Sequence, residues 1–328
     1  EKKSEYTEAT TSMLYNPTTK DWDWQTIDAL GLPRKIFTKL DRAGTLRGKL
    51  RPELAAELGI NQANFAAVGT HDTASAVAAI PGTGSFAFCS SGTWSLFGVE
   101  TDKPILTDAV RDANFSNEGT IQGGFRPLSN IMGLWLIQES RRAWRRQGRE
   151  YSYAELESLA LEAAPLRCFI DPDDPAFTPP GDIPARVREY CAATGQYVPQ
   201  TVGEVMRCIY ESLALKYRFA LGQLEAATGR RFAALHVLGG GAKDGLLCRM
   251  TADATGLRTA AGPVEATALG NILIQLVALG MLPSIDAGRR LIAKTERVTE
   301  YLPGDTAAWD AAHVRYEDLL RRGGKTEK

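Results

Sequence analysis

The chain has 328 residues, 44% of them hydrophobic and 23% charged, with a formal net charge of −1. This composition is typical of a globular protein with room for two domains. The near-neutral charge excludes a general attraction to nucleic acid or membrane surfaces. No apolar run approaches the roughly 20 residues of a membrane span. We therefore expect neither nucleic acid nor a membrane among its partners.

The five cysteines are widely spaced and form no CxxC pair. They are Cys89, Cys168, Cys191, Cys208 and Cys248. This spacing argues against a disulfide framework and against a zinc site, and it favours the reduced thiols of a cytoplasmic protein.

The first half of the chain predicts irregular and helical structure over its first sixty residues. An apolar strand over 65–68 then leads to His71-Asp72, and small residues predict a helix through Ala79. The segment Pro81-Gly82-Thr83-Gly84 breaks the chain, so we expect a domain boundary there.

Beyond this break, residues 85–89 and 94–99 predict a hairpin, and residues 130–146 predict a helix. Residues 165–185 predict a loop. A capping box at Thr201 begins a helix that the apolar spacing extends to Leu224.

The last third of the chain alternates strands and helices. The predicted order is a strand over 235–238, a Gly-rich turn, a helix from about Asp244, a strand over 257–261, and a largely apolar, buried helix over 265–279. This alternation predicts an α/β fold whose sheet is at least partly parallel.

The Gly239-Gly240-Gly241 turn is the strongest local signal for a ligand. Glycines between a strand and a helix let the backbone approach a ligand, and free N–H groups at a helix start favour an anion. Asp244 rules out a dinucleotide fingerprint, and Lys243 is not followed by the Ser or Thr of a Walker A loop. A plain tight turn remains the alternative.

Two further segments carry weaker signals. Ser90-Ser91-Gly92-Thr93 predicts a hairpin turn that could also present hydroxyls and N–H groups to phosphate oxygens. The arginine-rich run over 141–146 is better explained as the solvated end of a helix than as a nucleic-acid patch.

The pair His71-Asp72 has four interpretations. A Ser-His-Asp hydrolase would need a GxSxG elbow, which the sequence lacks. A metal-dependent phosphohydrolase would need histidines that the contexts of His236 and His313 do not supply. A helix cap needs only a short polar side chain before the helix. A carboxylate at the carboxyl end of a strand could instead accept a proton from a hydroxyl that attacks phosphorus.

Taken together, these segments resemble the FGGY family of carbohydrate kinases. GTHDTASAV, SSGTWSL, SNIMGLWLIQES, HVLGGGAKDGLL and GPVEATALGNILIQ occur in the order and spacing of that family. TEATTSMLYN near the start and NEGT at 117–120 extend the resemblance over nearly the whole chain.

The resemblance implies a ribonuclease-H-like α/β fold of the actin and hexokinase type, whose two domains close around a sugar and ATP. Residues 1–83 would be the remainder of the sugar-side domain, and residues 84–328 the nucleotide-side domain. The family begins with a DxGTTS phosphate loop that this chain lacks. We therefore expect the C-terminal two-thirds of a kinase, with an incomplete first domain.

The resemblance also implies roles for individual residues. Asp72 matches the general base that deprotonates the terminal hydroxyl of the sugar, with His71 and Thr73 lining the sugar site. Asn130, placed on the predicted helix, matches a substrate contact. Residues that match nucleotide contacts are Thr93, Gln138, Gly240 and Gly241. Glu8 and Met13 depart from the Asn and Gln of members that phosphorylate rhamnulose.

The implied activity is phosphorylation of L-rhamnulose to L-rhamnulose 1-phosphate with ATP and Mg²⁺, by a cytoplasmic monomer or homodimer. One alternative is a kinase for another sugar or polyol, such as fuculose or xylulose. A second is a chain that binds nucleotide without catalysis. An ATP-gated structural protein of the same fold is the third, but the His71-Asp72 pair argues against it.

Overall fold

The computed structural model describes residues 2–82 and 84–323, which form two compact units. Unit 1 comprises Glu1–Gly84, Gly98–Leu128 and Glu265–Val298. Unit 2 comprises Ser85–Phe97, Ser129–Val264 and Thr299–Lys328. The first division coincides with the break expected at residues 81–84. Two segments of unit 1, residues 98–128 and 265–298, belong to the second domain in the division expected from the sequence. That division into domains stays a prediction.

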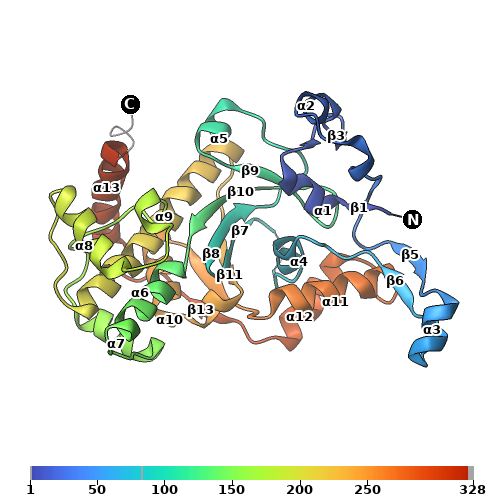
Figure 1. Cartoon of the computed structure of the whole chain (residues 1–328). Helices are drawn as coiled ribbons and strands as arrows, with labels where there is room; N and C mark the ends of the chain where they lie inside the picture. The colour runs from blue at the N-terminus through green and yellow to red at the C-terminus, as the bar shows by residue number, and fades with distance from the viewer. Residues whose placement is uncertain (1, 83, 324–328) are drawn as a thin grey trace. The chain divides into compact units, whose positions relative to one another are not determined.

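The first part of unit 1 is built from short elements (Figure 1). Three two-stranded sheets pair β1 with β4 in parallel, and β2 with β3 and β5 with β6 antiparallel. These strands are β1 (Ser4–Glu5), β2 (Tyr15–Asn16), β3 (Asp21–Trp22), β4 (Leu40–Asp41), β5 (Leu46–Lys49) and β6 (Asn64–Ala66); the helices are α1 (Tyr6–Ala9), α2 (Trp24–Ala29) and α3 (Pro52–Leu58).

Two helices of unit 1 pack at close range. All residues of α4 (Asp72–Ala78) except Asp72 are buried, and α11 (Ala266–Ala278) lies against them. A Cβ at Gly270 would lie 1.8 Å from the backbone oxygen of Ser75, so only glycine permits this approach. The unit is completed by α5 (Asp108–Asp112) and α12 (Ile285–Thr295).

A seven-stranded mixed sheet has the order β13-β12-β11-β7-β8-β10-β9. Strand β11 pairs in parallel with β7 and β12, while β12 with β13 and β10 with β9 are antiparallel. The strands are β7 (Phe86–Ser91), β8 (Trp94–Val99), β9 (Ser116–Gly119), β10 (Phe125–Met132), β11 (Ala234–Leu238), β12 (Arg258–Ala261) and β13 (Thr299–Tyr301). The α/β class, the hairpin of β7 and β8 and the partly parallel pairing are confirmed.

The long helix α9 lies at the centre of unit 2, and α7 and α10 pack against its buried side chains (Figure 1). The predicted capping box at Thr201 is confirmed, because the Thr201 hydroxyl accepts from the Glu204 N–H while the Glu204 carboxylate accepts from the Thr201 N–H. The helices are α6 (Trp135–Arg146), α7 (Tyr153–Glu162), α8 (Ile183–Ala193), α9 (Val202–Thr228), α10 (Gly245–Thr255) and α13 (Thr306–Gly323).

Three sequence-based expectations are wrong in detail. The helix predicted over 130–146 begins only at Trp135, because residues through Met132 extend strand β10. The strand predicted over 65–68 is β6, which ends at Ala66. Helix α11 is not wholly buried, because only Ala266, Gly270, Leu273 and Ile274 are inaccessible and Ile272 is 54% exposed.

The helices of the described residues do not meet the requirements for a membrane span. None of the helices within residues 2–82 and 84–323 combines the length and apolar character that crossing a bilayer requires.

Candidate functional site

The pair His71-Asp72 lies at the start of α4, where the chain enters the helix in unit 1. His71 is the N-cap residue, with extended backbone angles and no side-chain capping bond, and Asp72 is the first helical residue. The Asp72 side chain is 78% exposed. The capping interpretation is therefore wrong for this pair, and the carboxylate of Asp72 is open to an incoming ligand.

The imidazole of His71 is fixed by two buried charged side chains. Its Nδ1 atom lies 3.2 Å from a carboxylate oxygen of Glu118 and 3.1 Å from Nη2 of Arg126. Its Nε2 atom lies 3.7 Å from Oδ1 of Asp72. Arg126 can only donate and Glu118 can only accept. In either tautomer the ring is held in the same orientation beside Asp72.

The register of the sheet brings these two charges together. Arg126 on β10 pairs with Glu118 on β9, and both side chains are buried. Burial opposes ionisation of Glu118, but the hydrogen bond from His71 and the charge of Arg126 outweigh it and hold the Glu118 pKa below its usual value. Burial lowers the pKa of Arg126, and its Nη1 atom has no hydrogen-bond partner among the described residues.

A second buried carboxylate holds the loop before the helix. Glu5 accepts hydrogen bonds from the N–H of Thr7 at 3.0 Å and from both the N–H and the hydroxyl of Thr70, at 3.1 and 3.0 Å. The Thr7 hydroxyl also donates to Glu5 and accepts from the N–H of His71 at 3.3 Å. The segment around Thr7 therefore positions the backbone that carries His71.

Thr73 and Asn130, both predicted to line the sugar site, differ in their surroundings. Thr73 is 4% exposed, and its hydroxyl donates to Oδ1 of Asp72 at 3.3 Å. Asn130 is exposed on strand β10 of unit 2 rather than on a helix, so its predicted helical placement is wrong. The sugar contact itself stays a prediction for both residues.

The residues predicted to contact nucleotide lie in unit 2. Thr93 is in the turn between β7 and β8, and its hydroxyl donates to the side-chain oxygen of Gln138 on α6 at 3.5 Å. The backbone oxygen of Thr93 accepts from the N–H groups of Gly133 and Trp135. These bonds fix the start of α6 against the hairpin turn.

The glycine turn after β11 lies against the end of β7. Gly239 has a φ of +77°, and a Cβ at Gly241 would lie 2.1 Å from the Ser91 hydroxyl. A Cβ at Gly240 would meet nothing within 4 Å, so the backbone there faces open space. The turn thus combines a tightly packed side with an accessible one.

The accessible side of this turn borders a cavity of about 280 Å³ in unit 2. Apolar side chains of α6 and the ring of Tyr153 meet a few polar groups there, as in many small-molecule sites. The lining residues are Gly92, Leu134, Ile137, Gln138, Tyr153, Glu157, Gly240, Lys243 and Asp244. The structure therefore brings Gln138 and Gly240 to one cavity.

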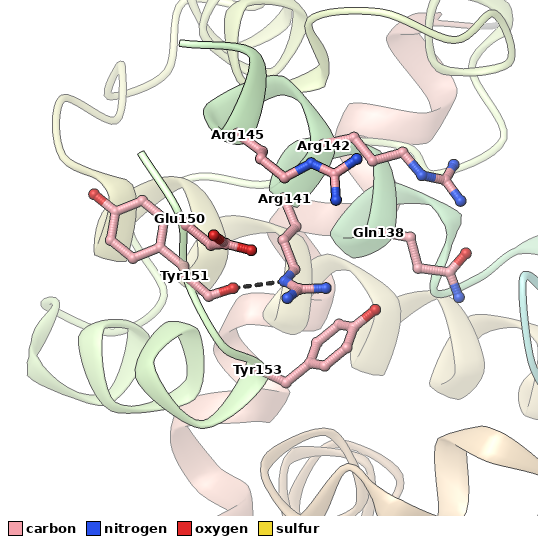
Figure 2. A pocket seen from close by; sticks show the side chains of 7 residues that line it. All are labelled: Gln138, Arg141, Arg142, Arg145, Glu150, Tyr151 and Tyr153. Carbon is pink, nitrogen blue, oxygen red and sulfur yellow. Dashed lines mark hydrogen bonds between the residues drawn. The ribbon is translucent and has the colours of Figure 1, made fainter. Parts of the chain in front are cut away.

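A second cavity of about 340 Å³ lies along α6 and shares Gln138 and Tyr153 with the first. Figure 2 shows the Arg141 side chain between the backbone oxygen of Tyr151, to which its Nε donates at 2.5 Å, and the Tyr153 ring. Arg142 and Arg145 are exposed, which agrees with the predicted solvated helix end. The three arginines that line this cavity, Arg141, Arg142 and Arg145, would suit an anionic group.

Sequence reasoning assigned no role to Glu5, Glu118 or Arg126. Glu118 lies in the NEGT segment that supported the resemblance, so a signal was present for it. Arg126 had no local signal, because its role depends on the register between β9 and β10.

Comparison with known proteins identifies the family that the chain matches. The model described as "FGGY family of carbohydrate kinases, C-terminal domain" matches residues 87–279, and that of the family's N-terminal domain matches residues 1–79. The rhamnulokinase of Bacteroides thetaiotaomicron is 42% identical over 97% of this chain and 65% of its own length. That of Enterococcus faecalis is 42% identical over 88% of this chain and 58% of its own length.

Solved structures share the fold at low identity. The chain superimposes on a ligand-bound xylulose kinase from Lactobacillus acidophilus with a TM-score of 0.76 at 15% identity, over 98% of this chain and 65% of the other. For a Plasmodium falciparum glycerol kinase with ADP, the TM-score is 0.70 at 13% identity, over 99% and 63%. The chain thus spans just under two thirds of the length of these relatives.

Proposed function

Because the chain belongs to the FGGY family of carbohydrate kinases, we propose that the protein transfers the γ-phosphoryl group of ATP to the terminal hydroxyl of L-rhamnulose. The observation that carries the proposal is the exposed Asp72 carboxylate beside a histidine fixed by buried charges. Several curated relatives at 36–42% identity are rhamnulokinases, which supports the choice of sugar.

Asp72 is the proton acceptor in this proposal. The hydroxyl oxygen of the sugar forms a bond to the γ-phosphorus, the bond from that phosphorus to the bridging oxygen of ATP breaks, and the hydroxyl proton passes to Asp72. A carboxylate can serve as this base only if a substrate can approach it, and the 78% exposure of Asp72 satisfies that condition. His71 and Thr73 orient the carboxylate and the sugar beside it.

The cavity beside Gly240 is the proposed site of the adenosine. Leu134, Ile137 and the Tyr153 ring offer apolar surface for a base, and Gln138 offers an amide for polar atoms. Thr93, held against Gln138, would present its hydroxyl to the phosphates. The backbone at Gly240 has no side chain in the way.

Mg²⁺ is part of the proposal as the ion that offsets the phosphate charge. This ion prefers carboxylate, water and phosphate oxygens. The Asp72 carboxylate fits it, because the side chain is 78% exposed and the close polar neighbours of its Oδ1 among the described residues are the Thr73 hydroxyl and His71 Nε2. Asp72 would contact the ion only through water, so that its carboxylate stays free to accept the proton and the ATP phosphates carry the ion. We place this activity in the cytoplasm, in a monomer or homodimer.

A sugar panel with the full-length gene product tests the proposal. With ATP and Mg²⁺, we expect L-rhamnulose to be phosphorylated with a higher kcat/KM than L-fuculose, D-xylulose or glycerol. Preferred turnover of another sugar would contradict the substrate assignment alone. The absence of phosphoryl transfer to any sugar, while ATP still binds, would contradict the kinase proposal.

A further inference from the structure

Three cysteines from separate elements meet inside unit 2. Cys168 lies in the loop after α7, Cys191 near the end of α8 and Cys208 in the second turn of α9. Their Sγ atoms all lie within 4.8 Å of one another, and the residues are 4%, 0% and 1% exposed. We call these residues the thiol cluster. Their sequence spacing, 23 and then 17 residues, gave no sign of it.

Hydrogen bonds hold the loop of the cluster on both sides of Cys168. The side-chain oxygen of Gln196 accepts from the N–H of Phe169 at 2.9 Å, and the backbone N–H of Gln196 donates to the backbone oxygen of Cys191 at 2.9 Å. The Ser212 hydroxyl accepts from the N–H of Ile170 at 2.9 Å and donates to the backbone oxygen of Cys208. Gln196 and Ser212 thus tie the loop to the backbones of the other two cysteines.

The thiols of the cluster also interact with one another. Hydrogen bonds from Cys191 and then Cys208 hold the pKa of Cys168 below the usual thiol value. Those same bonds to Cys168 raise the pKa values of Cys191 and Cys208. At these separations the three sulfur atoms lie close enough together to share one partner.

This geometry is close to that of a three-thiolate metal site. With a metal–sulfur bond of about 2.3 Å, a trigonal site places its sulfur atoms about 4.0 Å apart, only slightly closer than the 4.8 Å limit found here. Thiolates select soft cations. No other His, Cys, Asp or Glu within residues 2–82 and 84–323 joins the group at this distance, so the protein supplies three ligands.

The electrostatic surroundings suit a divalent cation better than a monovalent one. Three thiolates around a divalent ion leave one net negative charge, and the nearby charges of Glu204 and Arg167 act on the pKa of Cys168 in opposite directions. Arg207 is already paired with Glu211. A monovalent ion would leave two negative charges in a buried site, which is costly.

We propose that Cys168, Cys191 and Cys208 form a buried three-thiolate site for one soft d¹⁰ divalent cation, with Zn²⁺ as the physiological candidate. On loading, each thiol releases its proton to solvent and forms one sulfur–metal bond, and no electron is transferred. Because the cluster is buried, the ion enters during folding or local opening. The site is independent of the proposed kinase activity.

Cadmium titration of the full-length protein, reduced and freed of metal, tests this proposal. We expect sulfur-to-metal charge-transfer absorption that saturates at one Cd²⁺ per chain and that Zn²⁺ suppresses by competition. Bound metal should also raise the Tm, because it binds the native state. Cys168→Ala, Cys191→Ala and Cys208→Ala should each lose the saturable absorption and the Tm shift.

Two buried cysteines outside the cluster are matched controls. Cys89→Ala and Cys248→Ala also remove a thiol from a residue exposed by 0% and 1%, and both should keep the full signal. X-ray absorption at the metal edge of the loaded wild type provides a second measurement that does not depend on folding of the variants. It should show three sulfur neighbours.

Three results would overturn the proposal. The first is a folded, reduced wild type without saturable charge-transfer absorption. The second is a metal shell of nitrogen and oxygen atoms. The third is a disulfide between two cluster cysteines in the native protein, detected in non-reduced peptides by mass spectrometry.

Discussion

At the scale of single residues, His71 depends on charges that are far from it in the sequence. Glu118 and Arg126 face each other across two strands and both contact Nδ1 of the imidazole. An unpaired charge in this position would be costly, so each side chain needs the other. The contacts among His71, Glu118 and Arg126 therefore couple the stability of unit 1 to the geometry beside Asp72.

Glu118→Gln should reduce the loss of stability in acid. A carboxyl whose pKa is lower in the native than in the unfolded state stabilises the protein above the unfolded pKa of about 4.3. That contribution disappears as the pH falls through the lower native pKa, and Glu118 is of this kind. Between about pH 6 and pH 3, the wild type should thus lose more unfolding free energy than Glu118→Gln in urea titrations.

Glu53→Gln is the matched control, because Glu53 is an exposed residue in the first turn of α3 in the same unit. It should follow the wild type through the acid range. An equal acid loss in Glu118→Gln and the wild type would contradict the stabilising role of the Glu118 charge.

Residue-level inference from the sequence reached only the residues whose signal was local. The exposed carboxylate at Asp72 and the open backbone at Gly240 agree with their predicted roles, which themselves stay predictions. Arg126 and the thiol cluster were missed because strand register and the packing of three separate segments bring those side chains together. No window of sequence contains that information.

At the scale of elements, the packing of α11 on α4 fixes the helix that begins at Asp72. At the contact, the backbone of Ser75 lies directly against the backbone of Gly270, which has no side chain to keep the helices apart. Thr267 adds a hydrogen bond from its hydroxyl to the backbone oxygen of Asp72 at 3.4 Å. Arg289 on α12 donates to the backbone oxygen of Val77 at 3.0 Å and pairs with Glu100.

Gly270→Ala should separate these two helices. Its Cβ would lie 1.8 Å from the Ser75 oxygen, and overpacking of this kind costs about 1–3 kcal/mol. Urea unfolding would measure the loss.

Gly222→Ala is its control, because a Cβ at this position of α9 meets nothing within 4 Å. It should stabilise by roughly 0.5–1 kcal/mol through helix propensity. If both variants changed stability by the same amount, the close packing of α4 and α11 would be refuted.

The elements that the sequence predicted best are those with strong local periodicity or caps. The helix after Thr201 and the strand before Gly239 agree with the structure. Asn130 was misplaced because SNIMGLWL has apolar residues at helical spacing, while residues 125–132 form one strand, β10, which lies between β8 and β9 in the sheet. Tertiary pairing outweighed local pattern there.

At the scale of the whole molecule, the actin- and hexokinase-type α/β fold predicted from the sequence is confirmed by the solved structures of similar fold. The residues proposed for catalysis and for nucleotide binding belong to different compact units. Asp72 and His71 are in unit 1, and Thr93, Gln138 and Gly240 are in unit 2. We therefore expect loss of the base to leave nucleotide binding intact.

Asp72→Asn in the full-length protein separates catalysis from nucleotide binding. Asp108→Asn is the matched control, since Asp108 is also an exposed aspartate in the first turn of a helix in unit 1. We expect Asp72→Asn to lower kcat for L-rhamnulose phosphorylation by about 10²–10⁴-fold, the usual contribution of a general base, with unchanged ATP affinity, and Asp108→Asn to match the wild type. Wild-type turnover by Asp72→Asn would contradict the account.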